Sequence, residues 1–174
     1  MSDNIFKQTI PVLKTARLTL RPISLTDLEA MFNYASSENV ARYVTWEPHK
    51  SLDATKEFVE LILNGYEQKL IGTIDFVSIN STHKFAEIGY VLSEAYWNNG
   101  ITTEAAKKLI DFGFNELGLV RIQARCFEEN IGSQKVMEKS GMLFEGILRK
   151  SMFVKGNHQN VKMYAITDED YANS

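Results

Sequence analysis

A polar turn with one glycine, between an apolar strand and an amphipathic helix, is the part of this sequence most suggestive of chemistry. Residues 97–105 read WNNGITTEA and follow the apolar run IGYVL at residues 88–92. The first N–H groups of a helix have no acceptor within it and carry partial positive charge, so such a turn can bind a phosphate. Gly100 would let the backbone approach that ligand closely. A plain connecting loop looks the same, so the turn alone leaves both interpretations open.

Composition is that of an ordinary globular protein and excludes several classes of function. The length of 174 residues predicts one domain, 1–174, with its own core. A net charge of −3 argues against direct nucleic-acid binding as the main activity. No stretch approaches the roughly 20 apolar residues of a membrane helix, and no apolar signal core is present at the N-terminus. The single cysteine, Cys126, excludes an internal disulfide and is predicted to be a buried structural thiol in a cytoplasmic protein.

Periodic patterns along the chain predict an α/β protein. Strands are expected over residues 16–21, 70–79, 85–92, 120–126, 142–154 and 161–166. Four helices are expected. The first follows a capping box of Thr26 and Glu29, and the second follows the cap Ser51 and carries Phe58, Leu61 and Ile62 on one side. The third has an apolar stripe from Ala106 to Leu117, and the fourth runs from Asn130 to Gly141. Strands that alternate with helices, with hairpins near both ends, predict a mixed sheet flanked by helices.

Four motifs together resemble the GCN5-related N-acetyltransferase (GNAT) superfamily. They are RLTLRP at residues 17–22, AEIGYVL and YWNNGITTEA at 86–92 and 96–105, NIGS at 130–133, and SGM with EG at 140–142 and 145–146. The resemblance covers about residues 13–171 and is closest to the RimJ/RimL type of ribosomal-protein N-terminal acetyltransferase. It implies one GNAT domain whose mixed, mostly antiparallel sheet splays at the cofactor site and is flanked by about four helices.

The resemblance also implies where acetyl-coenzyme A would bind. Its pyrophosphate would lie on the turn made by Asn98, Asn99, Gly100, Ile101, Thr102 and Thr103. Its pantetheine would lie beside the strand end at Val91, Leu92 and Ser93, and would hydrogen-bond Asn130. Two strands that part midway leave unpaired backbone groups, which suit the amides of pantetheine.

Two residues of the implied site are candidates for catalysis. Glu87 is a carboxylate in an otherwise apolar strand beside the implied acetyl position, where it could act as a general base. The alternatives for Glu87 are an edge position or an ion pair with Arg121 or Arg149. Ser133 would donate a hydrogen bond to the leaving sulfur; alternatively, the spacing from Asn130 to Ser133 forms a helix cap and nothing more.

These observations predict direct transfer of an acetyl group from acetyl-coenzyme A to an amine. A protein N-terminal α-amine is favoured, because about a tenth to a fifth of such amines are neutral at pH 7, against under about a thousandth of lysine amines. A small amine such as a polyamine or aminoglycoside, and a non-catalytic module that binds coenzyme A, remain alternatives. No metal site is expected, since the histidines lack partners at metal-ligand spacing: His49, His83 and His158. The sequence leaves open the acceptor, the true general base, a homodimer, and the short segment 64–69, where relatives have an extra strand and turn.

Overall fold

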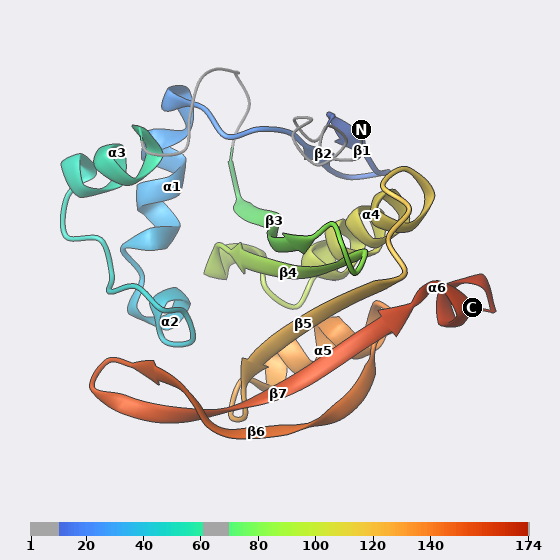
Figure 1. Ribbon diagram of the computed structural model, residues 1–174. Coiled ribbons are helices and arrows are strands. Elements are labelled where there is room, and N and C mark those ends of the chain that lie inside the picture. Colours follow the sequence, from blue (N-terminus) through green and yellow to red (C-terminus); the bar gives the residue numbers. More distant parts are fainter. Residues whose placement is uncertain (1–10, 61–69, 174) are drawn as a thin grey trace. The chain divides into compact units, whose positions relative to one another are not determined.

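Two compact units, each assembled from separate stretches of sequence, make up the computed structural model (Figure 1). The model describes residues 11–60 and 70–173. Of these, the first unit holds residues 74–89 and 102–173, and the second holds residues 11–60, 70–73 and 90–101. None of the helices in these residues is long and apolar enough to cross a membrane.

A five-stranded sheet forms the framework of the first unit, although the ends of β3 and β4 belong to the second. The strands are β3 (Gly72–Asn80), β4 (Phe85–Leu92), β5 (Arg121–Phe127), β6 (Leu143–Val154) and β7 (Asn157–Thr167). Their order is β3-β4-β5-β7-β6, with β4 and β5 parallel and β7 antiparallel to both of its neighbours. The predicted α/β fold with a mixed sheet is therefore confirmed.

Helices α4 (Ile101–Asn115) and α5 (Ile131–Lys139) accompany this sheet in the first unit. Gly113 lets α4 approach the sheet closely, because an added Cβ would meet Ile122 at 2.6 Å and Phe76 at 3.1 Å. Gly141, with φ of +91°, follows the end of α5 as predicted. The unit's core consists of apolar side chains on these helices and strands, including Ile88, Leu109, Ile110, Ile122, Met137, Val161 and Ile166.

A short C-terminal helix, α6 (Asp168–Ala172), was not expected from the sequence. Its start is fixed by a capping box, in which the Thr167 hydroxyl accepts the N–H of Asp170 and the Asp170 carboxylate accepts the N–H of Thr167. Together with the helices of the second unit, the described residues contain six α-helices rather than about four.

Helices α1 (Leu28–Ala35), α2 (Glu38–Ala41) and α3 (Leu52–Glu60) form the body of the second unit. Its buried cluster is made by Met31, Tyr34, Ala35, Val40 and Val59, with Ile23, Leu28, Trp46, Leu70 and Val91 packed against it. The predicted cap at Ser51 is confirmed, since its hydroxyl accepts the N–H of Ala54 at 3.2 Å. The predicted helical contacts of Leu61 and Ile62, and the segment 64–69, lie outside the described residues.

Two local predictions in the second unit were wrong. The strand expected over residues 16–21 is reduced to β2 (Thr19–Leu20), which pairs with β1 (Leu13–Lys14). The Thr15 hydroxyl accepts the N–H of Arg17 and of Leu18, and the turn thus formed prevents a longer strand.

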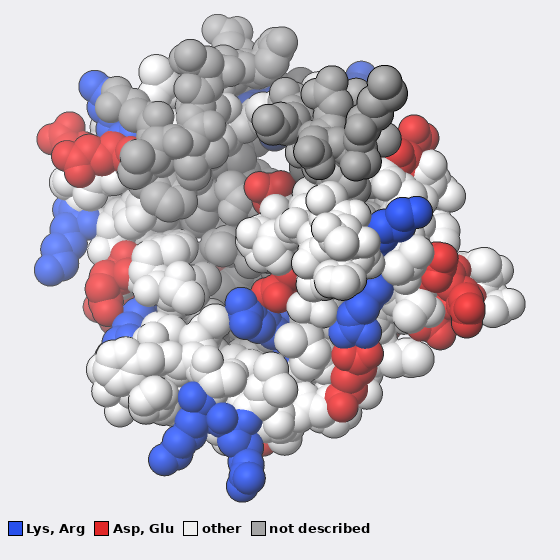
Figure 2. All heavy atoms as spheres, viewed as in Figure 1, with Lys and Arg blue, Asp and Glu red and all other residues white. Residues whose placement is uncertain are grey.

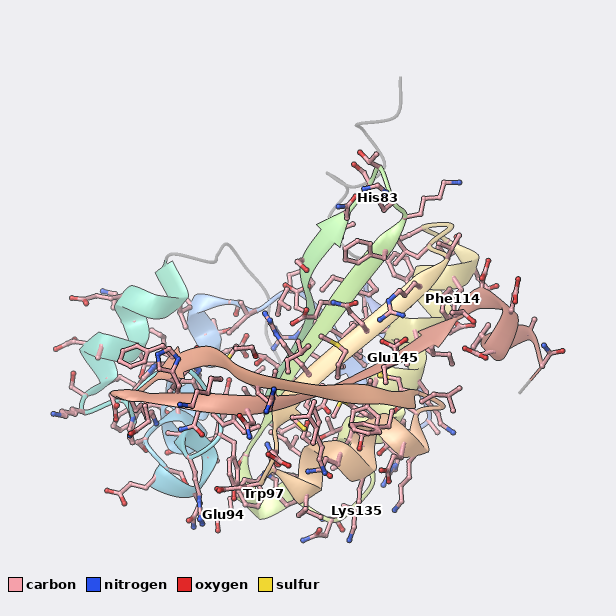
Figure 3. All side chains as sticks on the ribbon, turned by 60° about the horizontal axis from the view of Figure 1, so that its bottom comes forward. His83, Glu94, Trp97, Phe114, Lys135 and Glu145 are labelled. Carbon is pink, nitrogen blue, oxygen red and sulfur yellow. The ribbon has the colours of Figure 1, made fainter. Side chains whose placement is uncertain are left out.

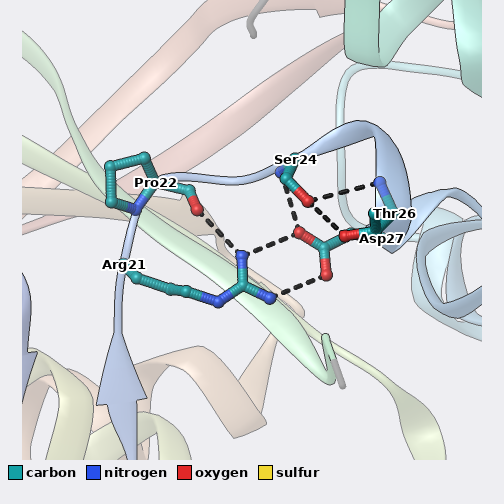
Figure 4. A network of polar contacts seen from close by, with 5 residues as sticks. All are labelled: Arg21, Pro22, Ser24, Thr26 and Asp27. Atoms are coloured by element: carbon teal, nitrogen blue, oxygen red, sulfur yellow. Dashed lines mark hydrogen bonds and ion pairs between the residues drawn. The ribbon is translucent and has the colours of Figure 1, made fainter. Parts of the chain in front are cut away.

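The capping box before α1 uses Ser24 and Asp27 instead of Thr26 and Glu29 (Figure 4). The buried carboxylate of Asp27 also binds Arg21, six residues earlier, and this ion pair favours the observed box over the predicted one, which begins two residues later. A 3-10 turn (Leu25–Asp27) therefore precedes α1.

Candidate active site

The strands β4 and β5 pair over only the first part of their length. Their parallel ladder runs over three residue pairs and ends with Glu87 opposite Gln123. Within the described residues the ladder stops there, although β4 runs on to Leu92 and β5 to Phe127. The second half of β4 therefore has an edge that β5 does not pair, and such an edge offers N–H and C=O groups to a ligand that carries amides.

Near the end of β4, the backbone groups point to two different edges. The N–H of Ser93 donates to the carbonyl of Ile71 at 2.8 Å. Since successive residues of a strand present their backbone groups to opposite edges, Val91 and Ser93 face β3 and Leu92 faces the other edge. The Leu92 carbonyl accepts the indole N–H of Trp97 at 2.9 Å. Of the three residues predicted to meet pantetheine, Leu92 thus presents its N–H to the unpaired edge, whereas the N–H of Ser93 is already used.

The predicted phosphate turn adopts left-handed backbone conformations at two positions. Asn98 has φ of +60° and Gly100 has φ of +72°. The side-chain amide of Asn99 donates to the carbonyls of Tyr96 at 3.3 Å and Trp97 at 2.9 Å. These two bonds close the turn directly before α4 begins, so its backbone is held by the turn's own side chain.

The beginning of α4 provides unpaired N–H groups after this turn. The helix starts at Ile101, so Ile101, Thr102 and Thr103 have no helical acceptor four residues earlier for their N–H groups. A helix of 15 residues also directs its dipole so that partial positive charge collects at this end. The arrangement fits the pyrophosphate that the sequence predicted here.

Arg17 lies beside the same turn, which the sequence analysis did not anticipate. Its Nη1 donates to the carbonyl of Asn99 at 3.0 Å, and its Nη2 lies 3.8 Å from where a Cβ on Gly100 would stand. Arg17 begins the RLTLRP motif, but nothing in that motif indicates a contact 82 residues away along the chain. A guanidinium next to the start of a helix strengthens the attraction of this turn for an anion.

Glu87 lies on one face of the first unit's sheet, with both carboxylate oxygens engaged. Its Oε1 is 2.8 Å from Nε of Arg125, and its Oε2 accepts the side-chain amide of Gln123 at 3.1 Å. The register explains these contacts, because Gln123 stands opposite Glu87 and Arg125 follows two residues later on the same face. Glu87 is buried and ion-paired, but its partner is Arg125 and not Arg121 or Arg149, the partners considered from the sequence.

The N-terminus of α5 brings Asn130 and Ser133 next to Cys126. The side chain of Asn130 accepts the N–H of Ser133 at 3.1 Å, so the predicted helix cap is confirmed. The partly exposed Ser133 hydroxyl hydrogen-bonds the sulfur of Cys126. Burial raises the pKa of the Cys126 thiol to about 11, although Ser133 and Lys162 act in the opposite direction. Cys126 is thus the buried thiol that the sequence predicted, and its raised pKa keeps it protonated at neutral pH.

The histidines are distributed over separate parts of the chain. Nδ1 of His49 lies 2.8 Å from the hydroxyl of Thr55, and partial burial lowers the pKa of His49. His83 and His158 are exposed, and His83 is seen at the turn after β3 in Figure 3. Over residues 11–60 and 70–173, no three His, Cys, Asp or Glu side chains are grouped to hold a metal ion. Figure 2 shows Lys and Arg interspersed with Asp and Glu on the face that it draws.

Comparison with known proteins identifies the family. Residues 17–143 match the family model described as "Acetyltransferase (GNAT) domain". The chain is 34% identical over 170 residues to the uncharacterized N-acetyltransferase YoaA of Bacillus subtilis, covering 90% of this chain and 96% of that protein. A GNAT-family acetyltransferase from Bacillus anthracis has a solved structure that matches with a TM-score of 0.81 and 33% identity, over 91% of this chain and 99% of that one.

A further solved structure is the spermidine N-acetyltransferase of Vibrio cholerae in complex with CoA and spermine. It matches with a TM-score of 0.75 and 25% identity, over 91% of this chain and 100% of that one. The chain belongs to the GNAT family and is an acyltransferase that depends on acetyl-coenzyme A.

Proposed function

We propose that this enzyme acetylates an α-amine at the unpaired edge of β4, with Glu87 as the group that takes up the amine's proton. Acetyl-coenzyme A supplies the acetyl group as a thioester when it is bound. The observation that carries the proposal is the position of Glu87, a buried carboxylate in the last residue pair before β4 and β5 separate.

Residues of the turn and of the β4 edge would hold the cosubstrate. The N–H groups of residues 98–103, with Arg17 beside them, suit the pyrophosphate. In the second unit, the N–H of Leu92 and the hydroxyl of Ser93 suit the amides of the pantetheine. The family resemblance adds Val91 and Asn130 to its contacts. Backbone N–H groups and a guanidinium thus suit the charged pyrophosphate, and hydrogen-bonding groups beside an apolar side chain suit the pantetheine.

The engaged carboxylate of Glu87 favours an acceptor that needs little help from a base. Arg125 and Gln123 each occupy one of its oxygens, so Glu87 acts through its remaining lone pairs or through one water. It accepts the proton that the amine gives up as nitrogen bonds to the acetyl carbon. An α-amine is already about a tenth neutral at pH 7, so such a base suffices, whereas a lysine-like amine would demand a stronger one.

Ser133 would stabilise the sulfur that leaves when the bond from carbon to sulfur breaks. A serine hydroxyl is a poor acid compared with a thiol of pKa about 8.5, so it would donate a hydrogen bond and not transfer its proton. In this structure the hydroxyl contacts the sulfur of Cys126, so it would turn from Cys126 to the leaving sulfur to act in this role.

A polyamine is the second candidate acceptor. The spermidine N-acetyltransferase of Vibrio cholerae shares the fold at 25% identity over its whole length, which favours this alternative. The guanidinium of Arg125 beside Glu87 opposes it, because it places a cation next to the proposed base, where a polycation would be repelled.

Release of coenzyme A thiol in the presence of a panel of amines tests the proposal. N-terminal peptides should give higher kcat/KM than spermidine or aminoglycosides. Glu87→Gln keeps the shape of the side chain and should lower kcat/KM by about 100-fold at pH 7, with a smaller loss at high pH, where the amine is neutral unaided. The control is Glu116→Gln, an exposed glutamate of the same unit. Wild-type activity of Glu87→Gln at pH 7 would leave Glu87 a structural residue.

Three further predictions from the sequence remain predictions: the RimJ/RimL type, a single domain over residues 1–174 and a cytoplasmic location. The type is supported by the motifs quoted above, and the location by the single cysteine, which fits a reducing compartment. A homodimer stays open and is measured by sedimentation of the purified chain.

A further inference from the structure

We propose that Gln123, Arg121 and Glu145 are positioning residues that orient Glu87 for acetyl transfer. The four side chains are joined one to the next across three strands, and all belong to the first unit. The proposal rests on the function proposed for Glu87, and it adds residues that would act through Glu87.

The contacts form an unbroken series. Glu145 binds Arg121 through two parallel bonds, from Nη1 and Nη2 to its two oxygens, each 2.6 Å long. Nε of Arg121 donates to Oε1 of Gln123 at 3.2 Å. Nε2 of Gln123 then donates to Oε2 of Glu87 at 3.1 Å. Nε, Nη1 and Nη2 of Arg121 therefore each have an acceptor within this series.

The hydrogen bonds of the series between Arg121 and Glu87 can be arranged in only one way. A guanidinium has only donors and an ionised carboxylate has only acceptors, whereas the two ends of an amide differ in this respect. With Arg121 on one side and Glu87 on the other, Gln123 satisfies both neighbours in only one of its two amide orientations. Arg121 therefore determines which end of Gln123 faces Glu87, and Glu145 holds Arg121 in place through a two-point contact.

An irregularity in β6 places Glu145 where it can do this. Phe144 pairs with Tyr164 and Gly146 with Met163, so Glu145 is one extra residue between two consecutive partners on β7. Gly146 has φ of +151°, a conformation that favours glycine. A bulge of this kind turns a side chain out of the regular alternation and is often found next to active sites. Figure 3 labels Glu145 on this sheet.

The series runs from an exposed carboxylate, Glu145, to a buried one, Glu87. Glu145 is the exposed end, with 42% of its side chain accessible, and Glu87 is the buried end with 11%. Arg121 lowers the pKa of Glu145, so the pair is lost only as the pH falls below the usual range of a glutamate. The pair of Arg121 and Glu145 therefore stays ionised throughout the pH range in which an amine acceptor titrates.

The test replaces Gln123 by methionine, which has a similar length and no amide. Gln123→Met should lower kcat/KM for the amine by about tenfold at pH 7, the size of one hydrogen bond to a charged group in the transition state. KM for acetyl-coenzyme A should stay within about twofold. At pH 9 the loss should shrink to under about threefold, because more of the acceptor is neutral there. A merely structural defect would not depend on pH in this way.

Double variants separate the series from independent effects. Glu145→Gln should lose about threefold at pH 7, and Glu145→Gln with Gln123→Met should lose no more than Gln123→Met alone, since both act along one path. Glu87→Gln with Gln123→Met should likewise match Glu87→Gln alone. Gln159→Met, in the same sheet, is the matched control for the substitution itself.

The outcomes distinguish this inference from the proposed function. Loss of activity in Glu87→Gln together with full activity in Gln123→Met would overturn only the positioning role. An equal loss in Gln123→Met at pH 7 and pH 9, or additive losses in the double variants, would overturn it as well. Full activity in Glu87→Gln would overturn the function proposed for Glu87 itself.

Discussion

Replacement of Asp27 by asparagine should strongly destabilise the second unit. The Asp27 side chain is fully buried, with 0% exposed, and it accepts hydrogen bonds from Nη1 of Arg21 at 2.9 Å, Nη2 of Arg21 at 2.8 Å and the N–H of Ser24 at 2.8 Å (Figure 4). Asparagine keeps the shape but removes the charge and turns one acceptor into a donor. The Arg21 side chain, which is 9% exposed, would then carry its charge beside a neutral amide.

The size of the effect follows from these contacts. Removal of one partner from a buried ion pair costs about 3–5 kcal/mol, because the other charge is left uncompensated. Arg21 keeps a bond to the carbonyl of Pro22 at 2.9 Å, so we expect the lower end, about 3 kcal/mol. For a chain of this size, that corresponds to a fall in Tm of about 6–12 °C.

Urea unfolding followed by tryptophan fluorescence measures this change. Both tryptophans, Trp46 and Trp97, belong to the second unit, so the signal reports on the part of the protein that contains Asp27. The matched control is Asp53→Asn, an exposed aspartate in the first turn of α3, which should cost under about 1 kcal/mol. If Asp27→Asn unfolds at the same urea concentration as Asp53→Asn, the buried ion pair does not have the importance inferred here.

Three other predictions concern the first unit. Ser133→Ala should lower kcat about tenfold to a hundredfold while calorimetry finds the Kd for coenzyme A within about threefold; wild-type turnover would limit Ser133 to the cap. Cys126, with a pKa of about 11, should be alkylated at pH 8 at least about 100-fold more slowly than an exposed thiol. The contribution of its burial to the free energy of unfolding should be complete below about pH 9 and be lost as the pH rises through 11. Gly113→Ala should cost about 1–2 kcal/mol in thermal unfolding, because the new methyl would meet buried Ile122 at 2.6 Å, whereas Gly132→Ala, with its nearest contact at 3.6 Å, should be neutral.

Elements with strong local signals were predictable from the sequence. The strand expected over residues 85–92 is β4 with the same bounds, because its apolar run is bordered by a polar turn on each side. The helix expected from Asn130 to Gly141 is α5, since an asparagine cap and a left-handed glycine are both local features. Short elements such as α2 and α6 were missed, because four or five residues are too few to show a periodicity.

The partners of charged residues could not be predicted in the same way. Glu87 was correctly placed in an apolar strand, but the choice of Arg125 over Arg121 depends on the register between β4 and β5 and on the bulge that brings Glu145 to Arg121. The contact of Arg17 with Asn99 likewise joins distant parts of the sequence. Residue types indicated that charge would be buried at the site, whereas the pairings follow only from the assembled strands.

The central position of β7 has a consequence for synthesis of the enzyme. β7 follows β5 and β6 in the sequence, yet it lies between them in the sheet and pairs with both. Until residue 167 has left the ribosome, β5 and β6 each present an open edge that invites wrong pairing. Glu145 reaches Arg121 only once β7 has brought β6 alongside, so the surroundings of Glu87 are complete only after β7 has formed. A chain that ends before β7 would therefore expose two strand edges and lack the contact of Glu145 with Arg121.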